Sequence, residues 1–210
     1  APTVTNASAN VAYNSAGQTI DLSSHVSGVF SSLTVASGPS HGSVSLSGTT
    51  ATYTPTAGYY GADSFTFTAT GPGGTSAPAT VSLTVATPAA PAVSNASANV
   101  SYNSAGQAIS LSGNVSGVFT SLAVASGPSH GSVTISGTTA TYTPTAGYFG
   151  ADSFTFTATG PGGTSAAATV SVTVAAPAAP TVTNASANVA YNSAGQTIDL
   201  SSHVSGVFSS

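Results

Sequence analysis

The stretch Ser64-Phe-Thr-Phe-Thr-Ala-Thr70 decides the fold, because apolar and hydroxyl side chains alternate along it without interruption. Period-two alternation places Phe65, Phe67 and Ala69 on one face of a β-strand and the hydroxyl groups on the other. The run Ala79-Thr-Val-Ser-Leu-Thr-Val85 alternates in the same way. These two runs predict half-buried strands, each with an apolar face and a polar face.

Five shorter runs of similar character come before these two strands. They cover residues 4–11, 18–22, 33–36, 43–46 and 50–54. Turn-forming sequences rich in Gly, Pro and Ser separate the runs, at residues 15–17, 37–42, 47–48, 55–58 and 71–74. About seven short strands, with a turn roughly every ten residues, predict an antiparallel sandwich of the immunoglobulin type. No segment combines helical periodicity with the start and stop signals of a helix.

The same pattern recurs along the chain with a period of 89 residues, which the equivalent prolines Pro2, Pro91 and Pro180 mark. The first two copies differ at about 15 positions, mostly by exchanges among Ser, Thr and Ala. Residues 179–210 then repeat residues 1–32 without a change. A period of this length fits one self-contained small sandwich and not a solenoid repeat.

We therefore predict an all-β chain of tandem immunoglobulin-like antiparallel β-sandwich domains. Repeat 1 covers residues 1–88, repeat 2 covers residues 89–177, and residues 178–210 form the first third of repeat 3. This last part is either a window on a longer array or a set of strands donated to a neighbouring molecule. The segments 86–91 and 175–180 each carry two prolines, which favour an extended and semi-rigid linker.

Charged side chains are almost absent from the chain. The 210 residues include no Lys, Arg, Cys, Met or Trp, and the only acidic residues are Asp21, Asp63, Asp152 and Asp199. Without cationic side chains the protein cannot neutralise phosphates, so we expect no nucleic-acid partner. No apolar run approaches the roughly 18 residues of a spanning helix, so we expect no membrane insertion of this segment.

Asp21 and His25 are the nearest approach to a metal-ligand cluster. On one extended strand they would share a face. Calcium takes about six to eight oxygen ligands, usually with several carboxylates, and zinc takes about four ligands in all. Repeat 2 has Ser110 and Asn114 at the two positions. We therefore assign no metal-binding residue and expect no cofactor.

Neither repeat carries the residue set of a catalytic centre. Nucleophilic catalysis requires a hydroxyl, a base and an orienting group within hydrogen-bond reach, and glycoside hydrolysis requires paired carboxylates. His41 and His130 each lie in a Pro-Ser-His-Gly turn without an acidic neighbour in the sequence. We assign no catalytic or cofactor-binding residue and expect no enzyme. We interpret both histidines as turn residues that hydrogen-bond the backbone.

Two further residue types recur next to the strongest strand of each repeat. Asp63 and Asp152 lie in the sequence Gly-Ala-Asp-Ser-Phe, where we expect the carboxylate to accept hydrogen bonds from the backbone of an adjacent loop. Tyr59 and Tyr148 precede it in Ala-Gly-Tyr. They match the tyrosine corner of sandwich folds, whose hydroxyl bonds the backbone.

Three segments of repeat 1 resemble a known class of repeats: Leu33-Thr-Val-Ala-Ser-Gly-Pro-Ser-His-Gly-Ser-Val44, Ala51-Thr-Tyr-Thr-Pro-Thr-Ala-Gly-Tyr-Tyr-Gly-Ala-Asp-Ser-Phe-Thr-Phe67 and Gly71-Pro-Gly-Gly-Thr-Ser76. They are similar to the bacterial Ig-like or cadherin-like tandem repeats that form the stalks of large secreted and surface proteins, many of them adhesins. Many relatives carry an acidic, calcium-associated segment before the Leu-Thr-Val strand. Residues 20–30 hold a single carboxylate there, so the resemblance does not extend to calcium.

The resemblance and the composition together imply a structural repeat region of a bacterial extracellular surface protein. Such a region acts as an adhesin stalk or spacer, or as a building block of an extracellular fibre. The expected partners are neighbouring repeats of the same array and copies of the chain in a fibre. Host-cell or matrix glycans would be contacted by domains outside this chain. The alternative is a binding module that recognises carbohydrate, ice or another cell surface through loops or rows of Thr side chains.

Overall fold

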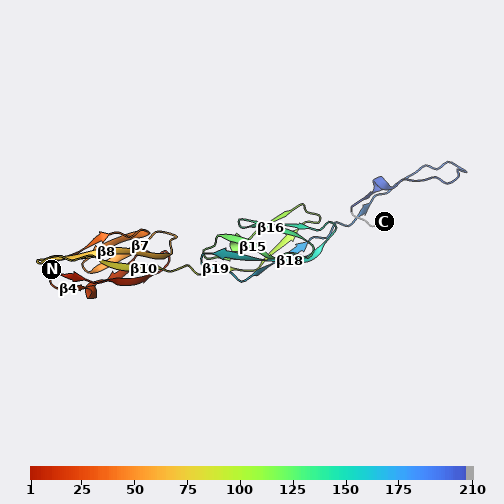
Figure 1. The fold of residues 1–210 in the computed structure, drawn as a ribbon. Helices are drawn as coiled ribbons and strands as arrows, with labels where there is room; N and C mark the ends of the chain where they lie inside the picture. The colour runs from red at the N-terminus through yellow and green to blue at the C-terminus, as the bar shows by residue number, and fades with distance from the viewer. Residues whose placement is uncertain (207–210) are drawn as a thin grey trace. The chain divides into compact units, whose positions relative to one another are not determined.

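The structure is a computed structural model that describes residues 1–206. It divides into two compact units, Ala1–Ala89 and Ala90–Ser210 (Figure 1). Each unit contains one β-sandwich, and the only helices among the described residues are 3-10 turns of three residues. The predicted all-β fold of tandem Ig-like sandwiches is confirmed.

The first unit contains ten strands and one 3-10 helix. In chain order they are β1 (Thr3–Val4), β2 (Ala7–Val11), β3 (Gln18–Asp21), η1 (Ser23–His25), β4 (Val26–Ser27), β5 (Ser32–Ser37), β6 (Gly42–Ser47), β7 (Thr50–Pro55), β8 (Gly61–Gly71), β9 (Gly74–Thr75) and β10 (Ala79–Val85). The predicted runs correspond to these strands, and the run at residues 4–11 is split in two. The short strands β4 and β9 and the helix η1 have no counterpart in the predictions.

The second unit repeats this order and continues into the third copy of the sequence. Its elements are β11 (Ala92–Val93), β12 (Ala96–Val100), β13 (Gln107–Ser110), η2 (Ser112–Asn114), β14 (Val115–Ser116), β15 (Ser121–Ser126), β16 (Gly131–Ser136), β17 (Thr139–Pro144), β18 (Gly150–Gly160), β19 (Gly163–Thr164), β20 (Ala168–Val174), β21 (Thr181–Val182), η3 (Ser201–His203) and β22 (Val204–Ser205). Residues 207–210 of the predicted repeat 3 lie outside the described residues.

Each sandwich has two main layers. In the first unit one sheet has the strand order β2-β10-β8-β5, with β9 added to β8, and the other has the order β3-β7-β6. The short pair β1-β4 completes the unit, and the second unit has the same arrangement. All pairs are antiparallel except β2 with β10 and β12 with β20, which are parallel. The predicted antiparallel sandwich thus contains one parallel pair in each domain. The sequence does not reveal this direction, because alternation along a strand carries no information about the direction of its partner.

The core lies between the two sheets of each unit. Phe65, Phe67 and Ala69 of β8 are at most 1% exposed, as the alternation predicts. They meet the three-stranded sheet, whose residues Ala51 and Tyr53 are fully buried. Burying a large apolar side chain contributes about 1.5–3 kcal/mol. This contribution matters in a chain that has no Cys for disulfides and no Lys or Arg for ion pairs.

Asparagine side chains fasten the first strands to the rest of the sandwich. The Oδ1 atom of Asn6, between β1 and β2, accepts a hydrogen bond of 2.9 Å from the N–H of Thr80 at the start of β10. Asn14 adopts a positive φ of 53° in the β2–β3 turn, and its Oδ1 atom accepts the N–H of Gly58 at 2.8 Å. Both bonds join residues far apart in sequence, so they close the sandwich and do not merely shape a turn.

The third copy of the sequence is folded differently from the first. Its described residues form only the pair β21-β22 and the turn η3. Val189 and Leu200 are 58% and 52% exposed, whereas the equivalent Val11 and Leu22 of the first unit are 1% and 0% exposed. The difference arises because the strands that cover Val11 and Leu22 in the first unit have no counterpart among residues 179–206.

Candidate functional site

A carboxylate at one corner of each sandwich collects hydrogen bonds from three separate segments. Asp63 lies near the start of β8. Its Oδ1 atom accepts the N–H groups of Ser40 at 3.0 Å and Ser64 at 2.9 Å. Its Oδ2 atom accepts the N–H of His41 at 3.0 Å and the hydroxyl of Tyr53 at 2.8 Å. The prediction that Asp63 accepts backbone hydrogen bonds from an adjacent loop is confirmed.

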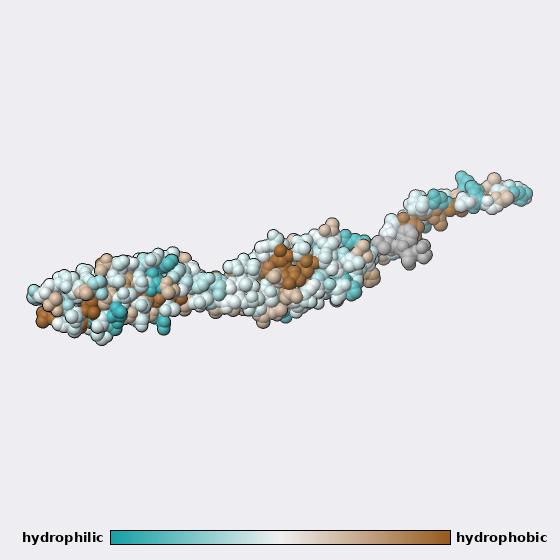
Figure 2. Space-filling view, in the orientation of Figure 1, coloured by the Kyte–Doolittle hydropathy of each residue, from teal (hydrophilic) through white to brown (hydrophobic). Residues whose placement is uncertain are grey.

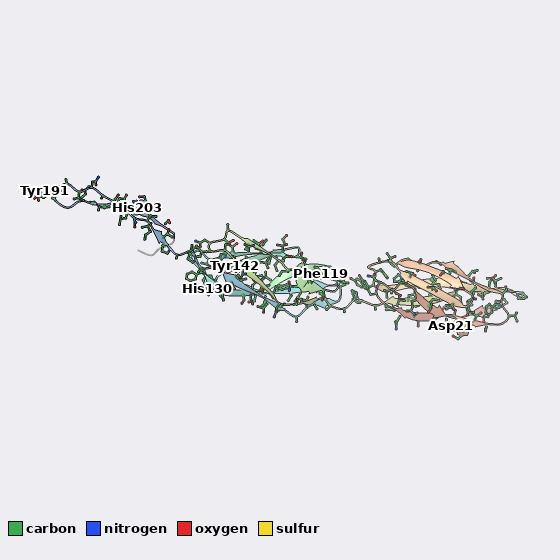
Figure 3. The ribbon with its side chains drawn as sticks, turned by 180° about the vertical axis from the view of Figure 1, so that it is seen from behind. Asp21, Phe119, His130, Tyr142, Tyr191 and His203 are labelled. Carbon is green, nitrogen blue, oxygen red and sulfur yellow. The ribbon has the colours of Figure 1, made fainter. Side chains whose placement is uncertain are left out.

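The second unit builds the same corner with the same residue types. Asp152 accepts the N–H groups of Ser129 at 3.0 Å, His130 at 2.9 Å and Ser153 at 2.9 Å. The hydroxyl of Tyr142 donates to its Oδ2 atom at 2.8 Å. Figure 3 labels Tyr142 and His130 in this domain. Both domains keep every donor, so the corner is a property of the repeat and not of one copy.

Burial and hydrogen bonding act in opposite directions on the acidity of this carboxyl. Burial alone raises the pKa of Asp63. The hydrogen bonds from Tyr53 and from the N–H groups of Ser64, Ser40 and His41 favour the charged form and together hold the pKa below its usual 3.8. Two causes raise the pKa of Tyr53 above its usual value of 10.0. The larger is burial of the hydroxyl, and the second is its hydrogen bond to the carboxylate of Asp63. The pair therefore stays as a neutral phenol and a charged carboxylate.

His41 takes part in the corner through its backbone and through stacking. Its carbonyl oxygen accepts the N–H of Thr56 at 2.8 Å, and its ring lies parallel to that of Tyr59 with centroids 4.1 Å apart. The expected backbone bonding of the turn residue is present, and the stacking was not predicted. The hydroxyl of Tyr59 donates to the carbonyl of Ala62, which confirms the predicted tyrosine corner.

Gly42 allows the turn to approach the buried tyrosine. A Cβ atom on Gly42 would lie 2.5 Å from the carbonyl oxygen of Thr54 and 2.6 Å from the ring of Tyr53. Only glycine fits at this separation. The motif Pro-Ser-His-Gly indicates a turn in the sequence. It does not reveal that a side chain at position 42 would collide with the ring of Tyr53.

The surface above each corner is a shallow hollow. The first has a volume of about 250 Å³ and is lined by Ser40, His41, Ala62, Asp63 and Ser64, and the equivalent hollow of the second unit measures about 280 Å³. The two oxygens of Asp63 already accept four hydrogen bonds, which fills the positions at which a carboxylate accepts donors. This group has no lone pair left for a metal ion or for a substrate proton.

Asp21 and His25 do not lie on one strand, since Asp21 ends β3 and His25 ends η1. The chain leaves β3 at Asp21 and turns into η1, because the Oδ1 atom of Asp21 accepts the N–H of Ser23 at 2.8 Å. This bond lowers the pKa of Asp21. The Nδ1 atom of His25 lies 3.2 Å from the hydroxyl of Thr5. Among residues 1–206 no group of three or more acidic or histidine side chains is placed to hold a metal ion.

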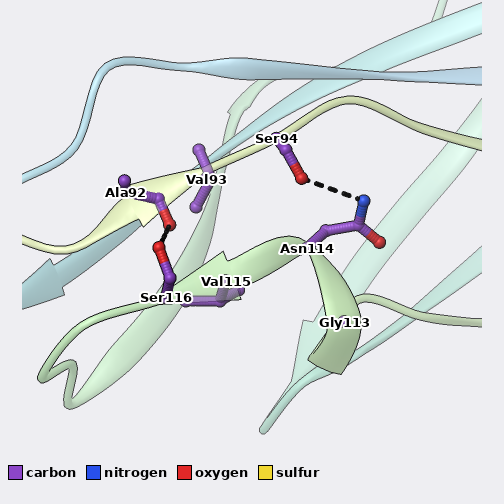
Figure 4. A pocket seen from close by; sticks show the side chains of 7 residues that line it. All are labelled: Ala92, Val93, Ser94, Gly113, Asn114, Val115 and Ser116. Carbon is purple, nitrogen blue, oxygen red and sulfur yellow. Dashed lines mark hydrogen bonds between the residues drawn. The ribbon is translucent and has the colours of Figure 1, made fainter.

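Repeat 2 makes the same local connection with an amide. The Nδ2 atom of Asn114, the counterpart of His25, donates to the carbonyl of Asn95 at 2.8 Å and to the hydroxyl of Ser94 at 3.2 Å. Asn114 and Ser94 border a small pocket of about 130 Å³ beside β11 and β14 (Figure 4). The side chain at the end of η1 or η2 therefore contacts the segment that follows the first strand, and either His25 or Asn114 can make this contact.

The face drawn in Figure 2 consists mostly of residues of intermediate hydropathy, with separate apolar patches among them. On the outer face of the five-stranded sheet, Thr34 and Thr68 bond each other through their hydroxyls at 3.0 Å, as do Thr70 and Thr75. The rows of Thr thus satisfy part of their hydrogen-bonding capacity within the sheet.

The two-layer sandwich with its tyrosine corner defines the immunoglobulin-like class of all-β domains. The sequence profile of the bacterial Ig domain family matches residues 1–84 and again residues 88–173. The chain therefore belongs to the bacterial Ig domain family and contains two tandem copies of the domain. Domains of this family are typically extracellular or exposed at the cell surface and typically have no catalytic role.

Among solved structures, protocadherin gamma B2 extracellular cadherin domains 3–6 share 17% identity with the chain at a TM-score of 0.38, covering 81% of this chain and 50% of that one. Drosophila N-cadherin EC1-4 shares 14% identity at a TM-score of 0.37, with coverage of 81% and 48%. An endo-fucoidan hydrolase of glycoside hydrolase family 107 shares 17% identity at 0.35, with coverage of 80% and 32%. The chain thus spans half or less of the length of these proteins.

A comparison with curated proteins gives no match. Within residues 1–206, no helix has the length and apolar character needed to cross a membrane.

Proposed function

We propose that this chain is a structural repeat region of a bacterial extracellular surface protein, which acts as a stalk or spacer or as a building block of an extracellular fibre. The observation that carries the proposal is the parallel pairing of the first long strand of each domain with the last. Ala7 pairs with Val81 and Val11 with Val85 along β2 and β10. The N–H of Ala86 extends the ladder to the carbonyl of Val11 at 2.8 Å.

This pairing determines how tension acts on a domain. When the chain is pulled from its ends, β2 is drawn toward its N-terminus and β10 toward its C-terminus. Because the two strands run in the same direction, these forces slide them past each other and load all ladder hydrogen bonds together. A pair that opened from one end would instead lose its bonds singly. The geometry therefore supports a role in bearing tension along the chain.

The polar residues of each domain support the same role. The carboxylates of Asp63 and Asp152 hold internal loops, and the ring of His41 is stacked on Tyr59. With no Lys or Arg and only four acidic residues, the surface carries few charges whose interactions salt could screen. A spacer of this composition keeps its properties over a wide range of ionic strength.

Force spectroscopy on single chains, tethered at both termini, tests the proposal. Each sandwich should unfold in one event, and each event should lengthen the chain by about 250 Å, given roughly 3.5 Å per extended residue. The chain should show two such events of similar length. A smooth extension without separate events would exclude the tension-bearing role.

A matched pair of proline variants shows whether the ladder carries the force. The carbonyl of Val11 points toward β10, so the N–H of Ala9, two residues earlier, points the same way. Ala9→Pro removes this donor and should lower the unfolding force of the first domain. Ala187→Pro makes the same change in the identical sequence of the third copy, where the residues up to 206 form no such ladder, and should leave both unfolding forces unchanged.

The second candidate function is a binding module for carbohydrate, ice or another cell surface. The observation that favours it is the exposed ring at position 60 in repeat 1 and position 149 in repeat 2, where Tyr60 is 44% and Phe149 is 55% exposed. A screen of the chain against immobilised glycans, with Tyr60→Ser and Phe149→Ser combined as the control, separates the two functions. Binding that the double variant abolishes would favour the module over the spacer.

A further inference from the structure

The two main sheets of the first unit end in four edge strands, and three of these strands are poor surfaces for pairing with another chain. The edges are β2 and β5 in the five-stranded sheet and β3 and β6 in the three-stranded sheet. A register shift between Val35 and Ser37 interrupts β5, and β3 has four residues before the chain enters η1. Bulges and short strands both oppose edge-to-edge association. β2 consists mostly of Ala, Ser and Asn, and Ala and Asn are depleted in strands.

The fourth edge strand, β6, has none of these protective features. It pairs with β7 over six residues without a register shift, and it contains no charged residue and no proline. β16 has the same properties in the second unit, and its Val, Thr and Ile residues are types enriched in strands. Each domain therefore has one regular and uncharged sheet edge, which is the kind of edge to which a further strand can be added.

The register of the β6–β7 hairpin shows which backbone groups of β6 face away from β7. The N–H of Thr56 donates to the carbonyl of His41 at 2.8 Å, and this bond continues the register of the ladder. Residues that bond a given neighbour alternate along an antiparallel strand, so the odd-numbered residues of β6 bond β7. The N–H and C=O groups of Val44 and Leu46 therefore point outward from the edge of the sheet.

We propose that two copies of this chain associate side by side through β6, in antiparallel orientation about a two-fold axis at Ser45. Val44 of each copy exchanges its outward backbone hydrogen bonds with Leu46 of the other copy. Ser45 faces its own counterpart across the axis, and Ser43 faces Ser47 of the other copy. β16 offers the same arrangement about Thr134, so each domain supplies one edge for lateral assembly.

The chemistry of the edge favours a second copy as the partner. Two identical antiparallel edges are self-complementary, because each outward N–H meets a C=O of the same segment in the other copy. The side chains beside the axis on the outer face are the exposed hydroxyls of Ser43, Ser45 and Ser47. Hydroxyls bond each other across strands and carry no charge that would repel an identical surface. The inward side chains of Val44 and Leu46 pack at the margin of the core, so the outer face of the edge stays polar.

Disulfide formation between introduced cysteines tests the pairing, because the natural chain contains no Cys. In the proposed register Ser45 and its counterpart form a pair with Cα atoms about 4.5 Å apart, and a disulfide spans about 4.4–6.8 Å. Thr19→Cys is the matched control for Ser45→Cys, because both positions are exposed and both pair with Thr52, from opposite sides. In the second domain Ala108→Cys is the control for Thr134→Cys.

The four variants are incubated with oxidised glutathione at the same protein concentration, and the fraction of covalent dimer is followed on non-reducing gels. We expect Ser45→Cys and Thr134→Cys to form dimers about tenfold faster than their controls, because pairing holds the two thiols at a raised effective concentration. Equal rates within a pair of variants would overturn the pairing of that edge.

Charges placed on either side of the axis test the register. In the Ser45→Cys background, Ser43→Lys combined with Ser47→Glu sets opposite charges face to face and should accelerate dimer formation. Ser43→Lys combined with Ser47→Lys sets like charges face to face and should slow it, so that the two rates differ about tenfold at low salt. The second combination lowers the net negative charge of the chain, so a general repulsion between chains would change the rates in the opposite direction.

The replaced serines are exposed in the single chain, so both combinations should keep the circular dichroism spectrum of the natural chain. Equal rates for the two combinations would show that the thiols meet in another arrangement, and the proposal would fail. The association uses β6 and β16, whereas the tension-bearing ladder uses β2 and β10. Force measurements on single chains do not involve a second copy, so the two proposals can fail independently.

Discussion

The buried hydroxyl of Tyr53 donates a hydrogen bond of 2.8 Å to the carboxylate of Asp63, and Tyr142 and Asp152 repeat the contact in the second domain. The tyrosines come from the three-stranded sheet and the aspartates from the five-stranded sheet. The bond therefore joins the two layers of each sandwich. The apolar core between the same two sheets joins the layers as well, by packing instead of hydrogen bonding.

Asp63→Asn should destabilise the first domain by about 2–3 kcal/mol, because an amide offers one acceptor oxygen to the four donors and leaves some of them unsatisfied. Denaturant unfolding of the chain measures the change, and the unaltered second domain serves as the internal reference. The matched variant Asp152→Asn should shift the second domain by a similar amount. Variants as stable as the wild type would show that the corner contributes little to folding.

The stability of both domains should fall in acid. The pKa values of Asp63 and Asp152 are lower in the folded protein than the usual 3.8, so folding favours their charged forms. This contribution is complete above the unfolded value and is lost as the pH drops through the folded value. Denaturant midpoints should therefore be constant between pH 7 and about pH 5 and should decrease below about pH 4.

Two comparisons check this assignment. In the double variant Asp63→Asn, Asp152→Asn the dependence on pH below about 4 should weaken in both domains, and Asp21 is then the remaining carboxyl of the first domain whose pKa is lowered. At the alkaline end the raised pKa of Tyr53 predicts that stability declines above about pH 10, where the unfolded phenol ionises first. A double variant that retains the full acid dependence would assign it to other groups.

Two glycines of the same turn region should respond differently to a methyl group. Gly42→Ala places a Cβ atom 2.5 Å from the carbonyl oxygen of Thr54, which is fixed in the β6–β7 ladder, and should cost about 2–3 kcal/mol. Gly38→Ala meets no atom within 4 Å and should be neutral or slightly stabilising. Thermal unfolding followed by circular dichroism compares the two. Similar melting temperatures would mean that the turn can move away from the ring of Tyr53.

The repeated sequence offers a further test in which the same substitution is made twice. Leu22→Ala opens a cavity in the first domain and should reduce its stability by about 2–5 kcal/mol. Leu200→Ala alters an identical local sequence whose side chain is half exposed, and it should leave both domain stabilities unchanged at micromolar concentration. Equilibrium unfolding in urea measures both. A large effect of Leu200→Ala under these conditions would mean that the third copy is packed in solution.

The sequence predicted several residues of the corner site, but it did not predict which side chains contact one another there. The recurrence of Asp63 and Tyr59 before the strongest strand indicated a backbone-bonding corner, and both roles are confirmed. The donor Tyr53 was not recognised, because in the sequence it is one aromatic residue in an alternating strand and its partner lies in another sheet. The stacking of His41 on Tyr59 was missed for the same reason: only the packing of two loops brings the rings together.

The sequence by itself determined that the chain is made of β-strands, that the domain occurs in duplicate, and that almost no charged chemistry is available. Alternation depends only on neighbouring residues, and repeat period and composition depend only on the order and number of residues. All three can therefore be determined without knowledge of the tertiary structure. The tertiary structure alone decided the parallel direction of β2 beside β10 and the environment of each apolar side chain. Leu22 and Leu200 have the same neighbours in sequence and opposite exposure, because burial depends on the strands that cover a residue and not on the residue itself.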